Sequence, residues 1–361
     1  MRQGAGRRRL LIGAAAAWLS TAIAQAAPRA ASPAPGSQAA HPAGAASPVP
    51  AGTPARPIFV LNSQDANVSV IDPLSYTEAR RITVGKEPHH LYLTPDEKSL
   101  IVANAAGNSL TFIDPASGAV QRQVGDIVDP YHLRFSPDMK WFVTAANRLD
   151  HVDLYRWEPQ AAKPFALVRR IQAPRTPSHL FIDSRSTVCY ASLQDSDELL
   201  AIDLATQAPR WKVKTGKMPA DVFVTADDRH LLVGLTGDKV VEVYDVSSPT
   251  RPATLVKRIT TGAGAHAFRA RGDKRHLFVS NRVANTISQI DLQGFAVVSE
   301  LPAPGGPDCM EMLADGRTLL VTSRWARKLT FIDIERRQVV RHVAVGRSPH
   351  GVWTLDHAPR A

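Results

Sequence analysis

Short stretches of alternating apolar and polar residues fill the chain from residue 57 onward. In the first complete unit these stretches are 90–94, 100–104, 109–114 and 119–124, and the segments between them are rich in Pro, Asp, Asn and Gly. Such alternation between turn residues is typical of half-buried antiparallel strands joined by hairpins. No stretch after residue 57 keeps a helical period. The pattern predicts an all-β fold with four strands in each unit.

The four-strand pattern repeats at intervals of 42 to 47 residues. A Gly-x-x-Pro-like step marks each unit at Pro88, Pro130, Pro177, Pro219, Gly264, Pro307 and Pro349. The residue that closes one strand of each unit is a second marker, at Asp72, Asp114, Arg156, Asp203, Asp245, Asp291 and Asp333. We expect this Asp series to be structural, because Asp at a strand end accepts turn amide protons. A period of this length is typical of a propeller, so the chain is predicted to form a seven-bladed β-propeller.

The two ends of the repeat region predict how the ring closes. After the last marker there is room for one strand, 350–355, whereas the first strands of the region, 58–61, 68–72 and 78–82, lack a first partner. Together they complete a seventh blade of one plus three strands, and closure removes the exposed sheet edges. Deletion of residues 345–361 is therefore predicted to unravel the fold.

These units resemble the YVTN-repeat (YncE-like) β-propeller family. The resemblance is carried by Gly85-Lys86-Glu87-Pro88, Pro95-Asp96-Glu97, Ile101-Val102-Ala103-Asn104 and Leu110-Thr111-Phe112-Ile113-Asp114, and by Phe278-Val279-Ser280-Asn281 in a later unit. It implies the propeller fold over residues 57–361. It implies little about function, because one fold serves many chemistries.

The first 56 residues differ in composition from the rest. Arg7, Arg8 and Arg9 precede an apolar run over 10–24 and the small-residue triplet Ala24-Gln25-Ala26, which is the pattern of an export signal over 1–26. The run is shorter than a membrane-spanning helix, so no transmembrane anchor is expected. Residues 27–56 are mostly Ala, Pro, Gly and Ser, the composition of a flexible tether. The protein is predicted to be periplasmic or secreted, through the Sec pathway with a twin-arginine signal as the alternative.

Charge and cysteine content exclude several classes of protein. Lys and Arg number 43 against 33 Asp and Glu, but six basic residues and no acidic ones precede Pro57, so the repeat region carries only +4. That balance gives weak support to a nucleic-acid partner. Two cysteines exclude a disulfide scaffold and a CxxCH haem attachment.

Histidines gather at one position of the repeat. Six of the twelve lie in the two residues after the step marker. The second of these residues is His90, His132, His179, Asp221, His266, Cys309 or Gly351, and the first is His89, Tyr131, Ser178, Ala220, Ala265, Asp308 or His350. The first strand of a propeller blade is the innermost, so equivalent residues are expected at one height around the axis. The imidazoles are therefore predicted to converge in the central funnel.

Converging His, Asp and Cys side chains are suitable ligands for a transition metal such as Cu, Zn or Fe. The candidate ligands are His90, His132, His179, Asp221, His266, Cys309, His89, His350 and Asp308. A haem lying across the funnel on His132, His90 or His179 is an alternative. A third interpretation has no ligand: each His donates a hydrogen bond to a carbonyl of the next blade.

The stretch from Pro130-Tyr131-His132 through Phe142-Val143-Thr144-Ala145-Ala146-Asn147 also resembles, more distantly, the d1-haem propeller of cytochrome cd1 nitrite reductases. This resemblance implies a distal-type role for His132. A missing c-haem domain weakens that reading. Three functions stay open: a monomeric exported binding protein for a metal or metallo-cofactor, with or without a periplasmic protein partner; an enzyme using that site for haem-type redox or metal-assisted hydrolysis; and an interaction scaffold. YncE-like relatives have been linked to DNA binding.

Overall fold

The computed structural model describes residues 55–248 and 250–360. The predicted export signal and residues 27–54 of the predicted tether lie outside these ranges. No helix in the described part of the chain is long and apolar enough to cross a membrane.

The described residues form seven sheets of four antiparallel strands each, as predicted. Two 3₁₀ turns, η1 (Ala105–Gly107) and η2 (Gln194–Ser196), are the helical elements of these ranges. The strands are β1 (Ile58–Asn62), β2 (Asn67–Asp72), β3 (Thr77–Thr83), β4 (Pro88–Leu93), β5 (Leu100–Asn104), β6 (Ser109–Ile113), β7 (Val120–Val124), β8 (His132–Phe135), β9 (Trp141–Ala146), β10 (His151–Trp157), β11 (Phe165–Gln172), β12 (Pro177–Ile182), β13 (Val188–Leu193), β14 (Glu198–Asp203), β15 (Ala208–Lys214), β16 (Pro219–Val224), β17 (His230–Leu235), β18 (Val240–Asp245), β19 (Thr254–Thr260), β20 (Ala265–Ala270), β21 (His276–Asn281), β22 (Thr286–Asp291), β23 (Ala296–Pro302), β24 (Pro307–Met312), β25 (Thr318–Ser323), β26 (Lys328–Asp333), β27 (Gln338–Ala344) and β28 (Pro349–Thr354).

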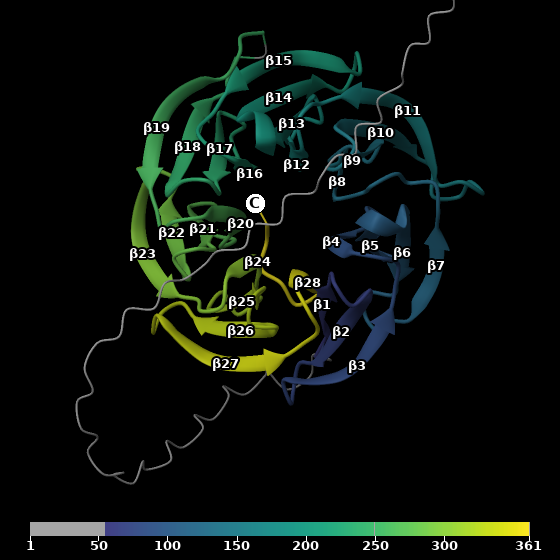
Figure 1. The fold of residues 1–361 in the computed structure, drawn as a ribbon, viewed down its shortest axis with the longest axis vertical. Helices are drawn as coiled ribbons and strands as arrows, with labels where there is room; N and C mark the ends of the chain where they lie inside the picture. The colour runs from purple at the N-terminus through teal and green to yellow at the C-terminus, as the bar shows by residue number, and fades with distance from the viewer. Residues whose placement is uncertain (1–54, 249, 361) are drawn as a thin grey trace, which may run out of the picture. The chain divides into compact units, whose positions relative to one another are not determined.

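The sheets stand as blades around a central axis (Figure 1). The first strand of each blade, such as β4 or β8, lies nearest the axis, and the fourth, such as β7 or β11, forms the rim. The closing blade has the order β28-β1-β2-β3, which confirms the predicted closure of one plus three strands. In it Phe59 of β1 pairs with Trp353 of β28, and their rings stack with centroids 6.2 Å apart.

Burial follows position within the blade. The middle strands are largely buried, and β5 is buried along its whole length, whereas most of the rim strand β3 is exposed. The core lies between neighbouring blades: Phe59 and Val68 of the closing blade pack with Leu91 and Leu100 of the next. Each sheet therefore covers the apolar face of its neighbour, and no single blade could bury that surface alone.

The recurring Asp closes a turn at the rim end of each blade that has it. Asp114 Oδ1 accepts hydrogen bonds from the backbone N–H groups of Ala116 and Ser117, at 3.0 and 2.7 Å. Asp72 and Asp203 accept from the equivalent amides. The structural role predicted for the Asp series is confirmed at these positions.

Candidate functional site

A β-bulge near the start of the innermost strand turns two consecutive side chains toward the channel. In a regular strand successive side chains point to opposite faces, so only one of His89 and His90 would face the axis. The pairing of β4 with β5 shifts register between Pro88 and Leu91, and such an irregularity re-aims a side chain. Equivalent shifts occur in β12, β16, β20 and β24. The fold thus supplies two channel-facing positions from each of these blades.

The channel side chains form two layers, which the strand pairing defines. The first layer holds His89, Tyr131, Ser178, Ala220, His266, Asp308 and His350. The second layer holds His90, His132, His179, Asp221, Ala267, Cys309 and Gly351.

His266 differs from its predicted register. Counting from the marker Gly264 predicted that His266 lies at the same height as His90. In the structure Ala265, and not Gly264, is the equivalent of Pro88, because Ala265 pairs with Asn281 in the way that Pro88 pairs with Asn104. His266 is therefore the equivalent of His89. This blade has one more residue before its inner strand than the spacing of the step markers predicts. The position of that extra residue follows from the strand pairing and could not be found by counting residues.

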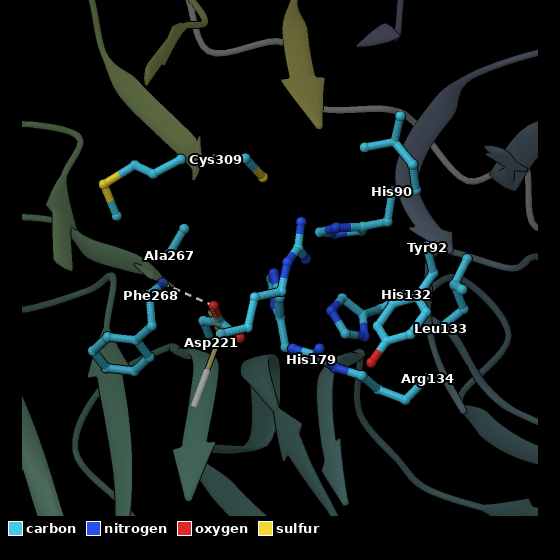
Figure 2. Close-up of a pocket in the computed structure, with 13 residues that line it drawn as sticks. His90, Tyr92, His132, Leu133, Arg134, His179, Asp221, Ala267, Phe268 and Cys309 are labelled. Atoms are coloured by element: carbon cyan, nitrogen blue, oxygen red, sulfur yellow. Dashed lines mark hydrogen bonds between the residues drawn. The ribbon is translucent and has the colours of Figure 1, made fainter. Parts of the chain in front are cut away.

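His90, His132 and His179 come together in the second layer, from three successive blades (Figure 2). Their ring centroids are 4.4 Å apart for His90 and His132, 4.9 Å for His132 and His179, and 5.3 Å for His90 and His179. One ligand nitrogen from each ring lies within 4.8 Å of the other two. The predicted convergence therefore holds for these three residues.

The first layer is a charged network. Both carboxylate oxygens of buried Asp308 accept from guanidinium groups, at 2.6 Å from Arg282 and 3.0 Å from Arg324. The Nε2 atoms of His266 and His350 lie 3.3 and 3.6 Å from Asp308 Oδ1. Because two cations already neutralise Asp308, a bound metal ion in this layer would be repelled by them.

His350 follows the ligand-free interpretation, since its Nδ1 lies 2.8 Å from the carbonyl oxygen of His89 in the next blade. A carbonyl only accepts, so Nδ1 carries the proton. The other channel histidines do not follow that pattern. Buried nitrogens that lack a hydrogen-bond partner among the described residues are His89 Nδ1, His90 Nε2, His132 Nδ1, His179 Nε2, His266 Nε2 and His350 Nε2. Buried polar atoms are normally paired. The Nε2 atoms of His266 and His350 face the Asp308 carboxylate, which leaves His89 Nδ1, His90 Nε2, His132 Nδ1 and His179 Nε2 as a cluster of four unpaired nitrogens.

The channel histidines are neutral at pH 7. Burial holds the pKa of His90, His132 and His350 well below its ordinary value of 6.5, and like charge on neighbouring imidazoles or arginines lowers it further. The same causes depress the pKa of His89. Burial lowers the pKa of His266 to about 3. Neutral imidazole is the form that binds metal ions.

A cavity of about 90 Å³ adjoins the three second-layer histidines. Asp221 and half-buried Cys309 line its other side (Figure 2). The carboxylate of Asp221 is held by the backbone N–H of Phe268, 2.8 Å from Oδ2. Burial and the charge of Asp308 raise the pKa of the Cys309 thiol well above its usual range.

Several channel residues were not predicted. Arg134, Arg282, Arg324 and Arg360 line the cavity or bind the first layer. The repeat pattern could have pointed to Arg282 and Arg324, because each directly follows the second strand of its blade. The repeat pattern could not have pointed to Arg360, because this residue follows the last repeat.

Solved structures with the same fold include the Pseudomonas aeruginosa periplasmic gluconolactonase PpgL, 19% identical with a TM-score of 0.71 over 84% of this chain and 99% of that one. A functionally unknown protein from Desulfotomaculum acetoxidans is 14% identical, with a TM-score of 0.70 over 85% and 100% of the two chains. Dihydro-heme d1 dehydrogenase NirN in complex with DHE is 16% identical, with a TM-score of 0.62 over 84% and 78%. These identities show the fold alone. Comparison with curated protein sequences gave no match.

A family model for the YNCE-like beta-propeller matches residues 10–360. The match spans all seven blades and agrees with the repeat motifs and the one-plus-three closure. The chain therefore belongs to the YncE-like β-propeller family.

Proposed function

We propose that this protein binds a transition-metal ion in its central channel through His90, His132 and His179. The observation that carries the proposal is the convergence of three imidazoles from separate blades, with ligand atoms within 4.8 Å of one another and a buried, unpaired nitrogen on each ring. Three histidines with an open fourth position are a common catalytic or exchangeable metal site. The cavity beside them supplies that position.

The donor set favours particular metals. Neutral imidazole suits Zn, Cu and Fe(II), and it excludes Ca and Mg, which need oxygen ligands. Metal–nitrogen bonds of about 2.0–2.1 Å place tetrahedral ligand atoms about 3.4 Å apart. Binding would therefore draw the three nitrogens inward by rotation of the rings. Asp221 or Cys309 lies on the same cavity wall as a candidate fourth ligand.

An organic cofactor is supported less well. Sites for such molecules occupy about 300–1,000 Å³, whereas the cavity measures about 90 Å³. A haem would need more room than this cavity offers, so the likeness to NirN is used here for the fold. In the proposal the first-layer candidates His89, His266, His350 and Asp308 support the metal-binding layer, and Asp308 is the charged one of the four.

Export of the protein is part of the same proposal. It depends on residues 1–26, whose composition matches an export signal. Fractionation of cells expressing the full chain should place the processed protein outside the cytoplasm. A full-length product in the cytoplasm would contradict export without affecting the metal proposal.

Chelator competition tests the metal site. Purified protein is titrated with Zn²⁺ in the presence of a chromophoric chelator, and the wild type is compared with His132→Ala. The matched control is His276→Ala, because His276 begins β21, is bonded to Asp273 and belongs to neither channel layer. We expect one tight site in the wild type and the control, and at least a tenfold weaker site in His132→Ala. Equal affinities in all three proteins would refute the assignment.

A further inference from the structure

The segment after β28 crosses the end of the channel. It leaves the closing blade and runs toward the centre of the ring (Figure 1). It pairs there with the end of β24: Ala358 N donates to Met312 O at 2.8 Å, and Asp356 O accepts from Ala314 N at 2.8 Å. We name residues 356–360 the C-terminal strap.

A buried ion pair anchors the strap. Arg269 of β20 donates Nε to Glu311 of β24 at 2.6 Å. The same guanidinium donates to the strap carbonyls, at 2.6 Å to Ala358 and 2.9 Å to Pro359. Arg269 is 5% exposed and Glu311 fully buried. The second oxygen of Glu311 accepts from Arg360. Two inner strands therefore hold the strap through charged hydrogen bonds, the stronger kind.

Arg360 brings the strap into the candidate site. Its side chain lines the same 90 Å³ cavity as His90, His132 and His179. In the first layer Asp308 and His350 are both 0% exposed. Arg360 therefore places the strap side on a route to the second layer.

The strap is not needed to close the ring. β28 ends at Thr354, before the strap begins, and the strap adds one isolated bridge, Leu313 with His357, instead of a full strand. The pair between Arg269 and Glu311 joins β20 to β24 and does not itself involve the strap. Its hydrogen bonds therefore serve the channel mouth, and a short contact of this kind can open without global unfolding.

We propose that the C-terminal strap is a lid of the metal cavity, and that an ion or its co-ligand enters and leaves by displacing Arg360 and its neighbours. This inference rests on the proposed metal function for its ligand, but access to the cavity can be measured without any metal. With the strap seated, the small cavity volume restricts co-ligands to a few atoms.

Alkylation of Cys309 measures access directly. Cys309 lines the cavity, and Cys189 is 0% exposed and serves as an internal control. Metal-free wild type, Arg360→Ala and a protein ending at His357 are treated with iodoacetamide, and modification of each cysteine is followed by mass spectrometry. The matched control is Arg337→Ala, an exposed arginine in the β26–β27 turn. Circular dichroism and the urea midpoint confirm that every variant is folded.

We expect Cys309 to react at least tenfold faster in the truncated protein, and faster in Arg360→Ala than in the control, while Cys189 stays unmodified in all. Zn²⁺ release to excess chelator should accelerate in the same order. Unchanged Cys309 rates in both strap variants would overturn the lid. If Zn²⁺ does not bind the wild type, the metal proposal fails, and the alkylation rates alone still decide the lid.

Discussion

At the scale of the residue, burial and close contact between imidazoles disfavour the protonated form of the channel histidines. Several imidazoles lie in contact with one another at a buried position: the rings of His89 and His350 are 3.7 Å apart at their centroids. Protonation of any of them would place like charges together in a medium of low polarity. The channel is therefore a place where neutral nitrogen lone pairs are concentrated.

This neutrality predicts how stability depends on pH. The pKa of a channel histidine is lower in the folded state than its ordinary 6.5, so the unfolded chain takes up the proton first. The free energy of unfolding is therefore unaffected by the titration of these residues above about pH 6.5, and it falls as the pH is lowered toward the folded-state pKa. Each such residue adds a slope of up to about 1.4 kcal/mol per pH unit. Urea unfolding of His266→Gln between pH 6.5 and 5 should show a shallower slope than the wild type. Parallel slopes would contradict the assignment.

Asp308 is the residue whose charge the first layer most requires. Asp308→Asn would leave Arg282 and Arg324 without their carboxylate in a largely buried setting. Loss of one partner of a buried ion pair costs about 3–5 kcal/mol. Arg81→Ala, which removes an exposed pair with Glu78, should cost no more than about 1 kcal/mol. Similar urea midpoints for the two variants would show that the first layer does not depend on this charge.

Residue identity in the channel was predictable, but its geometry was only partly so. The repeat register alone brought together His90, His132 and His179, because equivalent positions of a propeller lie around one axis. The bulge that lets both His89 and His90 face the channel depends on strand pairing, and so does the offset of His266. The Arg282 and Arg324 contacts with Asp308 depend on side-chain conformations that no spacing encodes.

At the scale of the element, an Asp closes the turn between the third and fourth strands in every blade except the one that carries Arg156. Asp114 lies between two strands whose connection it closes by accepting two backbone amides and the Ser117 hydroxyl. Those hydrogen bonds hold the pKa of Asp114 below its usual value. The stability they supply is present above the unfolded-state pKa near 4 and is lost as the pH falls through the folded-state value.

Asp114→Ala should lower the free energy of unfolding by about 1–2 kcal/mol, as expected for hydrogen bonds to a charged acceptor. The measurement is urea denaturation at pH 7. Asp114→Asn keeps an acceptor oxygen and should recover part of the loss. An effect of zero for the alanine variant would show that the recurring Asp does not stabilise the turn.

At the scale of the whole molecule, β28 closes the ring of blades, whereas the C-terminal strap that follows it is proposed to control access to the cavity. β28 completes the sheet with β1, and fully buried Trp353 fills the space beside Phe59. Deletion of 345–361 removes that strand and should abolish the cooperative urea transition, whereas a chain ending at His357 should keep it. Far-UV circular dichroism and limited proteolysis distinguish the two. A cooperative transition in the longer deletion would show that the ring does not need its closing strand.

The fold was more predictable than the site. Two markers repeating seven times specify blade number, and the unmatched first and last strands specify the closure. The strap contact of Arg360 lies beyond the repeat, so periodicity says nothing of it, although it bears directly on access to the cavity.

The central claim is that imidazoles from three blades hold one metal ion. X-ray absorption at the zinc edge of the Zn²⁺-loaded protein tests it most directly. We predict a shell that includes three imidazole nitrogens at about 2.0–2.1 Å, falling to two or fewer in His132→Ala. A wild-type shell of oxygen ligands without imidazole, or a spectrum unchanged in His132→Ala, would contradict the account.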